Sequence, residues 1–272
     1  MTPSRALILA LAGSTLWACN EQKAAPPPPA PPPPAAAEAP PPPPPPAEAP
    51  PPAAAADPAA AGGNGTIKGV VAFEGAVPAP TKLDMSKDPA CGKINKEGTV
   101  TEVAVKDGKL ADVFVYIKSG LKEGATFPAR TDVPTLDQRG CIYQPLMIGL
   151  QTGQKVKIIN SDPTLHNVHA LAKRGEFNTA MPKKDSVIEK SFPKPEVPIE
   201  VKCEVHPWMK AHFGVVDHPF FAVTGADGSF TIEGVPAGKY TLELVHGKLG
   251  TQTVEVTVSG GAAAEAQASF KG

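Results

Sequence analysis

The apolar and polar positions after residue 65 alternate in short segments, and no segment of similar length keeps a helical period. The clearest segments are residues 66–73, 110–118, 154–160, 197–203, 229–235, 240–247 and 251–258. In the last of these, Val254, Val256 and Val258 alternate with polar residues, which predicts one buried and one solvated face. Glycine, proline and aspartate separate the segments, so the pattern predicts an all-β sandwich.

The residues before position 65 have a composition that cannot build a hydrophobic core. More than half of the 34 prolines lie between residues 21 and 62, in a tract of little besides proline and alanine. Such a tract favours the extended polyproline II conformation, which has no internal hydrogen bonds. We therefore expect residues 20–64 to be a disordered linker and the folded part to begin at about residue 65.

The first nineteen residues resemble a lipoprotein signal peptide. Arg5 precedes an apolar run that is too short to span a membrane as a helix. The run ends in Leu-Trp-Ala-Cys, which resembles the bacterial lipoprotein box with Cys19 as the lipidated residue, while ordinary cleavage beside a free cysteine is the alternative. Asn20 is similar to the residue that follows this cysteine in outer-membrane lipoproteins. The resemblance implies a cell-envelope protein, anchored through Cys19, with its folded head in the periplasm or at the cell surface.

The overall charge of the chain excludes some classes of partner. The 26 basic and 27 acidic residues give a formal net charge of −1. Neither nucleic acid nor an anionic membrane surface is indicated by such a balance.

The cysteines other than Cys19 divide into a pair and a single residue. In an exported protein, thiols are expected to be paired or bound to a metal. Cys91 and Cys141 have no histidine or methionine at ligand spacing, so we expect a disulfide between them, with two buried free thiols as the alternative. This leaves Cys203 in Cys-Glu-Val-His-Pro-Trp-Met, with His206 and Met209 at three-residue intervals.

A thiolate, two imidazoles and a weak thioether form the ligand set of a blue-copper site. Residues 203–209 have the Cys-x-x-His-x-x-Met spacing of the amicyanin ligand loop, and His-Asn-Val-His at residues 166–169 is similar to the amicyanin segment that carries the other histidine. The resemblance to this cupredoxin family implies one mononuclear copper with the ligands His166, Cys203, His206 and Met209. It also implies that Asn167 ties the two ligand segments together.

The remaining histidines and methionines receive more ordinary interpretations. On a strand, residues three apart point to opposite faces, so His169 is predicted to point outward or to support a ligand from behind. The sequence predicts surface or turn positions for His212, His218 and His246, and core or loop positions for Met85, Met147 and Met181. Trp208 fits either core packing or a partly exposed place at the edge of the copper site.

Two folded blocks follow from these observations. Residues 65–218 are expected to form a Greek-key, cupredoxin-like copper-binding domain. Residues 219–272 contain Asp-Gly-Ser-Phe-Thr-Ile-Glu-Gly-Val-Pro-Ala-Gly-Lys-Tyr, which resembles carboxypeptidase regulatory-like, transthyretin-like domains. This block has too few strands for an independent sandwich, so we expect it to pack on the first block or to share strands with it.

The expected function is one-electron transfer by a membrane-anchored blue-copper protein, with His206 as the exposed exit for electrons and redox proteins as partners. Copper storage or delivery at the cell envelope is an alternative, and so is a structural or binding β module with a degenerate copper site. We expect no enzymatic activity, because multicopper oxidases and copper nitrite reductases need further histidine clusters and the chain has only six histidines.

Overall fold

A computed structural model describes residues 65–259, 261 and 263–272, and their regular secondary structure is β-strand apart from one short helix. The expected signal peptide at residues 1–19, the lipidation site Cys19 and the linker at residues 20–64 lie outside the described residues. No helix in the described part of the chain has the length and apolar character needed to cross a bilayer.

The first sandwich is formed by strands β7 to β15. One sheet has the order β13-β10-β7-β8 and the other the order β12-β11-β14-β15-β9. The core between them contains Leu136, Ile158, Val201 and Phe213, which are all fully buried. The strand bounds are β7 Thr135–Gln138, β8 Tyr143–Gln144, β9 Met147–Gln151, β10 Val156–Asn160, β11 His166–Ala170, β12 Phe177–Met181, β13 Ser186–Lys190, β14 Glu196–Lys202 and β15 Lys210–Val216.

The second sandwich combines strands from the two ends of the described chain. One sheet has the order β17-β1-β5-β4 with β20 also paired to β1, and the other has the order β16-β6-β18-β19. Ile67, Val115, Leu242 and Phe270 lie in the core of this sandwich. The strand bounds are β1 Gly65–Glu74, β4 Val105–Lys106, β5 Lys109–Leu110, β6 Val113–Ser119, β16 Phe221–Val223, β17 Ser229–Val235, β18 Gly238–His246, β19 Gly250–Val258 and β20 Ala263–Lys271.

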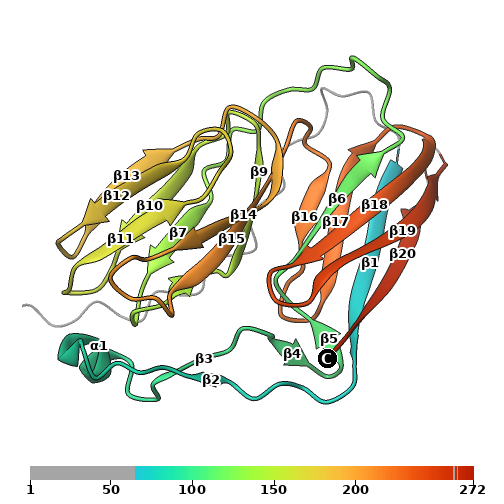
Figure 1. The fold of residues 1–272 in the computed structure, drawn as a ribbon. Coiled ribbons are helices and arrows are strands. Elements are labelled where there is room, and N and C mark those ends of the chain that lie inside the picture. Colours follow the sequence, from blue (N-terminus) through green and yellow to red (C-terminus); the bar gives the residue numbers. More distant parts are fainter. Residues whose placement is uncertain (1–64, 260, 262) are drawn as a thin grey trace, which may run out of the picture. The chain divides into compact units, whose positions relative to one another are not determined.

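The expected boundary at residue 218 does not separate the two sandwiches. Strand β1 pairs in parallel with β20 from Thr66 opposite Ala263 to Glu74 opposite Lys271, and antiparallel with β17. Strand β6 pairs with β16 and β18. Figure 1 shows this arrangement, with β1 in cyan beside β20 in red. Residues 219–272 therefore share both sheets with the earlier block, since β1 lies between β17 and β20, and β6 lies between β16 and β18.

A segment between β1 and β4 adds no strand to either sandwich. It contains the short pair β2 (Thr81–Lys82) and β3 (Thr99–Val100), and between them the helix α1 (Pro89–Ile94). The helix begins at this point because Asp88 caps it, accepting hydrogen bonds from the backbone N–H groups of Ala90 and Cys91, and because Pro89 occupies its first turn.

Two of the three histidines expected at surface or turn positions are buried. His218 is 5% exposed, and its Nε2 donates to the carbonyl oxygen of Ile117 at 2.8 Å. His246 is 3% exposed, and burial lowers its pKa to about 4. Both lie in the second sandwich. The sequence did not indicate their burial, because this sandwich combines strands from distant parts of the chain. Met85, Met147 and Met181 are buried, as expected for core residues.

Candidate metal centre

The expected ligand loop connects two neighbouring strands of one sheet. Strand β14 ends at Lys202 and β15 begins at Lys210, so residues 203–209 form the whole connection. The backbone N–H of Cys203 donates to the carbonyl oxygen of Met209 at 3.2 Å, and the N–H of Met209 donates to the carbonyl oxygen of His206 at 2.9 Å. The paired strands and these two bonds fix the loop.

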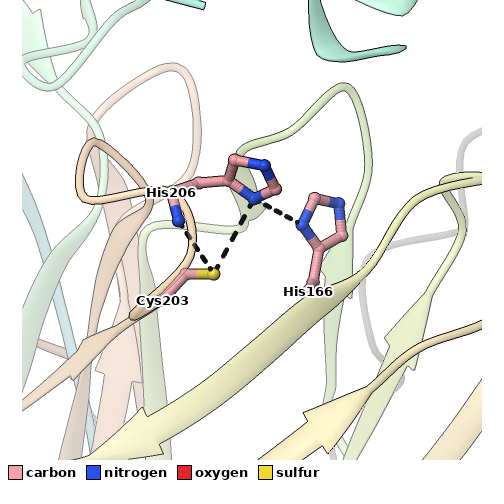
Figure 2. Close-up of side chains that lie close together, drawn as sticks. All are labelled: His166, Cys203 and His206. Atoms are coloured by element: carbon pink, nitrogen blue, oxygen red, sulfur yellow. Dashed lines mark hydrogen bonds between the residues drawn. The ribbon is translucent and has the colours of Figure 1, made fainter. Parts of the chain in front are cut away.

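The donor atoms of Cys203, His166 and His206 converge in the folded chain. His166 is the first residue of β11, in the same sheet as the strands that hold the loop. His166 Nδ1 lies 2.9 Å from His206 Nδ1, and the Sγ atom of Cys203 lies 3.8 Å from the latter. The three potential ligand atoms all lie within 4.8 Å of one another. Figure 2 shows the three side chains pointing toward one another.

This donor set fits copper on chemical grounds. One thiolate and two imidazoles suit a soft or borderline transition metal, and the three residues are no more than 1% exposed. Met209, the expected weak fourth ligand, is also 1% exposed and lies at the end of the same loop. The residues present therefore match the group that the sequence predicts.

The surroundings of Cys203 favour its thiolate form. Burial acts to raise its pKa, but hydrogen bonds from His166, from His206 and from the backbone N–H groups of Asn167 and His206 together lower it to about 6. The backbone N–H of His206 lies 3.4 Å from the sulfur. Because only the thiolate binds a metal strongly, these contacts prepare the residue as a ligand.

Two aspartates that the sequence reasoning missed contact the outer nitrogens of the histidines. His166 Nε2 lies 3.0 Å from an oxygen of Asp162, and His206 Nε2 lies 2.9 Å from an oxygen of Asp88. Asp162 also accepts the backbone N–H groups of Gly140 and Cys141, at 2.8 and 2.7 Å. A turn signal, Asn-x-Asp before His166, and a helix-start signal, Asp-Pro before Cys91, were visible in the sequence, but neither indicated which side chain it would face.

Asn167 links the two segments that carry the expected ligands. Its Oδ1 atom accepts the backbone N–H of Glu204 at 2.5 Å, and its own carbonyl oxygen accepts the hydroxyl of Tyr143 at 2.7 Å. Asn167 therefore holds the ligand loop against β11, in the manner that the resemblance implies.

His169 lies outside the group of donor atoms. Its Nδ1 and Nε2 atoms lie 2.6 Å from Glu204 and 2.8 Å from Glu176, and these hydrogen bonds raise its pKa. It thus faces away from the cluster and contacts the ligand loop through Glu204.

The expectation that His206 is exposed is wrong. Its side chain is 2% exposed, because Asp88 and Cys91 of the α1 segment lie over it, and the sulfur of Cys91 is 3.5 Å from its Nε2. The disulfide between Cys91 and Cys141 is present, as the sequence predicted. Trp208 is partly exposed. Its ring centroid lies 5.1 Å from that of His206, and its Nε1 donates to the carbonyl oxygen of Cys141 at 2.9 Å.

Comparison with known proteins gives a family match for one end of the chain. Residues 213–270 match the model for the β-sandwich domain of ER membrane protein complex subunit 7. The expected carboxypeptidase regulatory-like family is not the one that matches, although both descriptions concern β-sandwiches. No curated protein matches the chain in sequence.

Solved structures similar to part of the chain are cupredoxin-fold proteins. An oxidised amicyanin variant is 21% identical over 37% of this chain and 97% of its own, with a TM-score of 0.29. A purple cupredoxin from Nitrosopumilus maritimus is 20% identical over 30% and 98%, with a TM-score of 0.27. The copper-containing nitrite reductase of Thermus scotoductus SA-01 is 20% identical over 36% of this chain, with a TM-score of 0.28. The match spans only 25% of the reductase chain. Identities at this level concern the fold alone.

Proposed function

We propose that this protein is a blue-copper electron carrier of the bacterial cell envelope. The observation that carries the proposal is the convergence of Cys203 Sγ, His166 Nδ1 and His206 Nδ1 in a buried site. A copper ion bound there would supply one-electron chemistry between its Cu(I) and Cu(II) forms. The chain's own residues hold the donor atoms and exclude water.

The position of the ligands suits electron transfer better than catalysis. His166 comes from a strand and the other ligands from a seven-residue connection between paired strands, so the sheet restrains all of them. A restrained site changes little between oxidation states, which favours rapid transfer. Each candidate metal cluster in the described residues includes His166 or His206, so these clusters offer no separate catalytic centre. We therefore propose a carrier and not an enzyme.

The proposed carrier is attached to a membrane by lipid on Cys19 and exchanges electrons with other redox proteins of the envelope. The support for this placement is the signal-like segment at residues 1–19 and the proline-rich tract that follows it. A head on such a tether could reach partners well away from its anchor.

Spectroscopy of the purified full-length protein with added Cu(II) tests the proposal. We expect one copper per chain, an intense visible thiolate-to-copper band, and a reversible reduction potential. Cys203→Ser should abolish the band and leave the β-sheet circular dichroism unchanged, since sulfur is the source of the band and Cys203 is outside the Cys91–Cys141 disulfide.

His169→Ala is the matched control, because His169 is close in sequence to His166 but its ring nitrogens hydrogen-bond to Glu176 and Glu204. It should keep the band. A wild-type protein that binds copper without a strong visible band would contradict the carrier assignment. Rapid loss of the copper to a chelator, with no stable potential, would favour the delivery alternative instead.

A further inference from the structure

The acidic side chain over His206 is Asp88, which belongs to a segment that contributes no strand to the sandwich with the candidate metal centre. Asp88 directly precedes α1, and one of its oxygens, Oδ1, accepts the backbone N–H groups of Ala90 at 2.8 Å and Cys91 at 3.4 Å. This oxygen caps the helix. The carboxylate is therefore fixed in place by its own helix before it contacts anything else.

The second oxygen of Asp88 faces the candidate metal centre. Its Oδ2 lies 2.9 Å from His206 Nε2 and accepts the hydroxyl of Thr164 at 3.1 Å. Thr164 lies two residues before His166, so Asp88 contacts both ligand segments. The imidazole of His206 thus has one nitrogen beside a carboxylate and the other, Nδ1, beside Cys203 and His166.

The helix that carries Asp88 is attached to the sandwich in two places. Cys91 forms the disulfide with Cys141, and both cysteines are fully buried. At the other end of the helix, the Nδ2 atom of Asn95 donates to the carbonyl oxygen of Gly140 at 3.1 Å. The backbone N–H of Cys141 also donates to the carboxylate of Asp162, which contacts His166. The disulfide therefore joins the surroundings of both histidines.

We propose that Asp88 is a positioning residue for His206, and that the Cys91–Cys141 disulfide holds Asp88 over that imidazole. A carboxylate that accepts a hydrogen bond from Nε2–H keeps the ring proton on that nitrogen. Nδ1 is then free to bind a metal, and the imidazole is a stronger metal ligand. Asp162 has the same relation to His166, so each histidine is fixed by its own aspartate. The inference rests on the proposed copper site for its metal-dependent consequences, but its account of the imidazole applies without metal.

Variants at position 88 can separate helix capping from contact with His206. Asp88→Ser retains a good cap but its side chain is too short to reach the imidazole. Asp88→Asn keeps one oxygen for the cap but places an NH2 group, which can only donate, where Oδ2 faces His206. Asp84→Ser is the control, because Asp84 is exposed on the same segment and contacts only the neighbouring Ser86.

The first measurement uses metal-free full-length protein and long-range nitrogen–proton NMR of the histidine rings. We expect His206 to be protonated at Nε2 in the wild type and in Asp84→Ser. In Asp88→Asn the side-chain NH2 donates to Nε2, so the ring proton should move to Nδ1. In Asp88→Ser the ring should exchange between its two tautomers. This readout does not depend on copper, so it tests the inference even if the protein is not a copper carrier.

The second measurement is copper affinity by competition with a chelator, together with the reduction potential. Asp88→Ser should weaken binding by about 10- to 100-fold, the usual effect of losing such a support. Asp88→Asn should also weaken binding, because its NH2 group favours a proton on Nδ1, the nitrogen that would bind the metal. It should raise the potential, because the lost negative charge favoured Cu(II). Cys91→Ser with Cys141→Ser should weaken binding in the same direction, and adding Asp88→Ser to that pair should have little further effect.

The inference is overturned if Asp88→Ser has the same His206 tautomer and the same copper affinity as the wild type and the Asp84→Ser control. It is also overturned, in its second part, if the cysteine pair can be replaced with no change in the His206 ring. Absence of the visible band in the wild type, with the tautomer results as expected, would reject the carrier function and leave the positioning role intact.

Discussion

At the scale of single residues, the burial of His206 leaves Trp208 as the candidate exit for the electron transfer that we propose. Trp208 is the partly exposed aromatic residue that packs against this imidazole, with ring centroids 5.1 Å apart. It lies in the same loop as the ligands, and its Nε1 is held by the carbonyl oxygen of Cys141. We expect electrons to pass between the site and a partner through Trp208.

Replacement of Trp208 tests this route. Trp208→Leu should slow electron self-exchange severalfold, because an aliphatic side chain removes the aromatic contact between the imidazole and the surface. The visible band should stay, since Trp208 is not a ligand. Trp208→Phe retains a ring at this position and serves as the control. Equal self-exchange rates for the leucine variant and the wild type, measured by NMR line broadening, would show that the electrons leave elsewhere.

At the scale of elements, the second sandwich depends on strands that are far apart in sequence. One of its sheets combines β1, β4 and β5 from before residue 120 with two strands from after residue 220, and the other combines β6 with three such later strands. In particular, the whole length of β20 lies along β1. Without β1 and β6, residues 219–272 have two incomplete sheets and bury too little apolar surface to be stable.

A fragment of residues 219–272 should consequently fail to fold alone. Its amide proton NMR spectrum should show the narrow dispersion of an unfolded chain, whereas the full-length protein should show the wide dispersion of β-sheet. A well-dispersed spectrum of the fragment would mean that its own strands are sufficient and that β1 and β6 are additions.

At the scale of the whole molecule, we propose that lipid on Cys19 anchors the protein and that the proline-rich tract tethers its folded part. Cys19→Ser should release the protein from the membrane fraction of the cell into the soluble periplasmic fraction, because the acylated residue is lost. The visible spectrum of the released protein should be unchanged, since the copper ligands lie after residue 165. Fractionation followed by immunoblotting checks the outcome, and a variant that stays with the membranes would show that another part of the chain anchors it.

The sequence by itself determined the fold class and the local spacing of Cys203, His206 and Met209. Alternation in residues 229–235 and 251–258 predicted strands β17 and β19 closely. The two-residue period of a half-buried strand can be recognised from neighbouring residues alone. The Cys-x-x-His-x-x-Met spacing is equally local. It fits between paired strands, where Cys203 and His206 lie together and His166 joins them from β11.

Other features depended on contacts that no local pattern encodes. Strand β20 is rich in alanine, a weak strand former, and it becomes a strand through its pairing with β1, about two hundred residues earlier. The burial of His206 has the same kind of origin. Asp88 and Cys91 precede it by more than a hundred residues, and only the folded chain brings the carboxylate and the disulfide over the imidazole. Sequence spacing specifies which residue types are available, whereas packing between distant segments decides which atoms meet and which of them reach water.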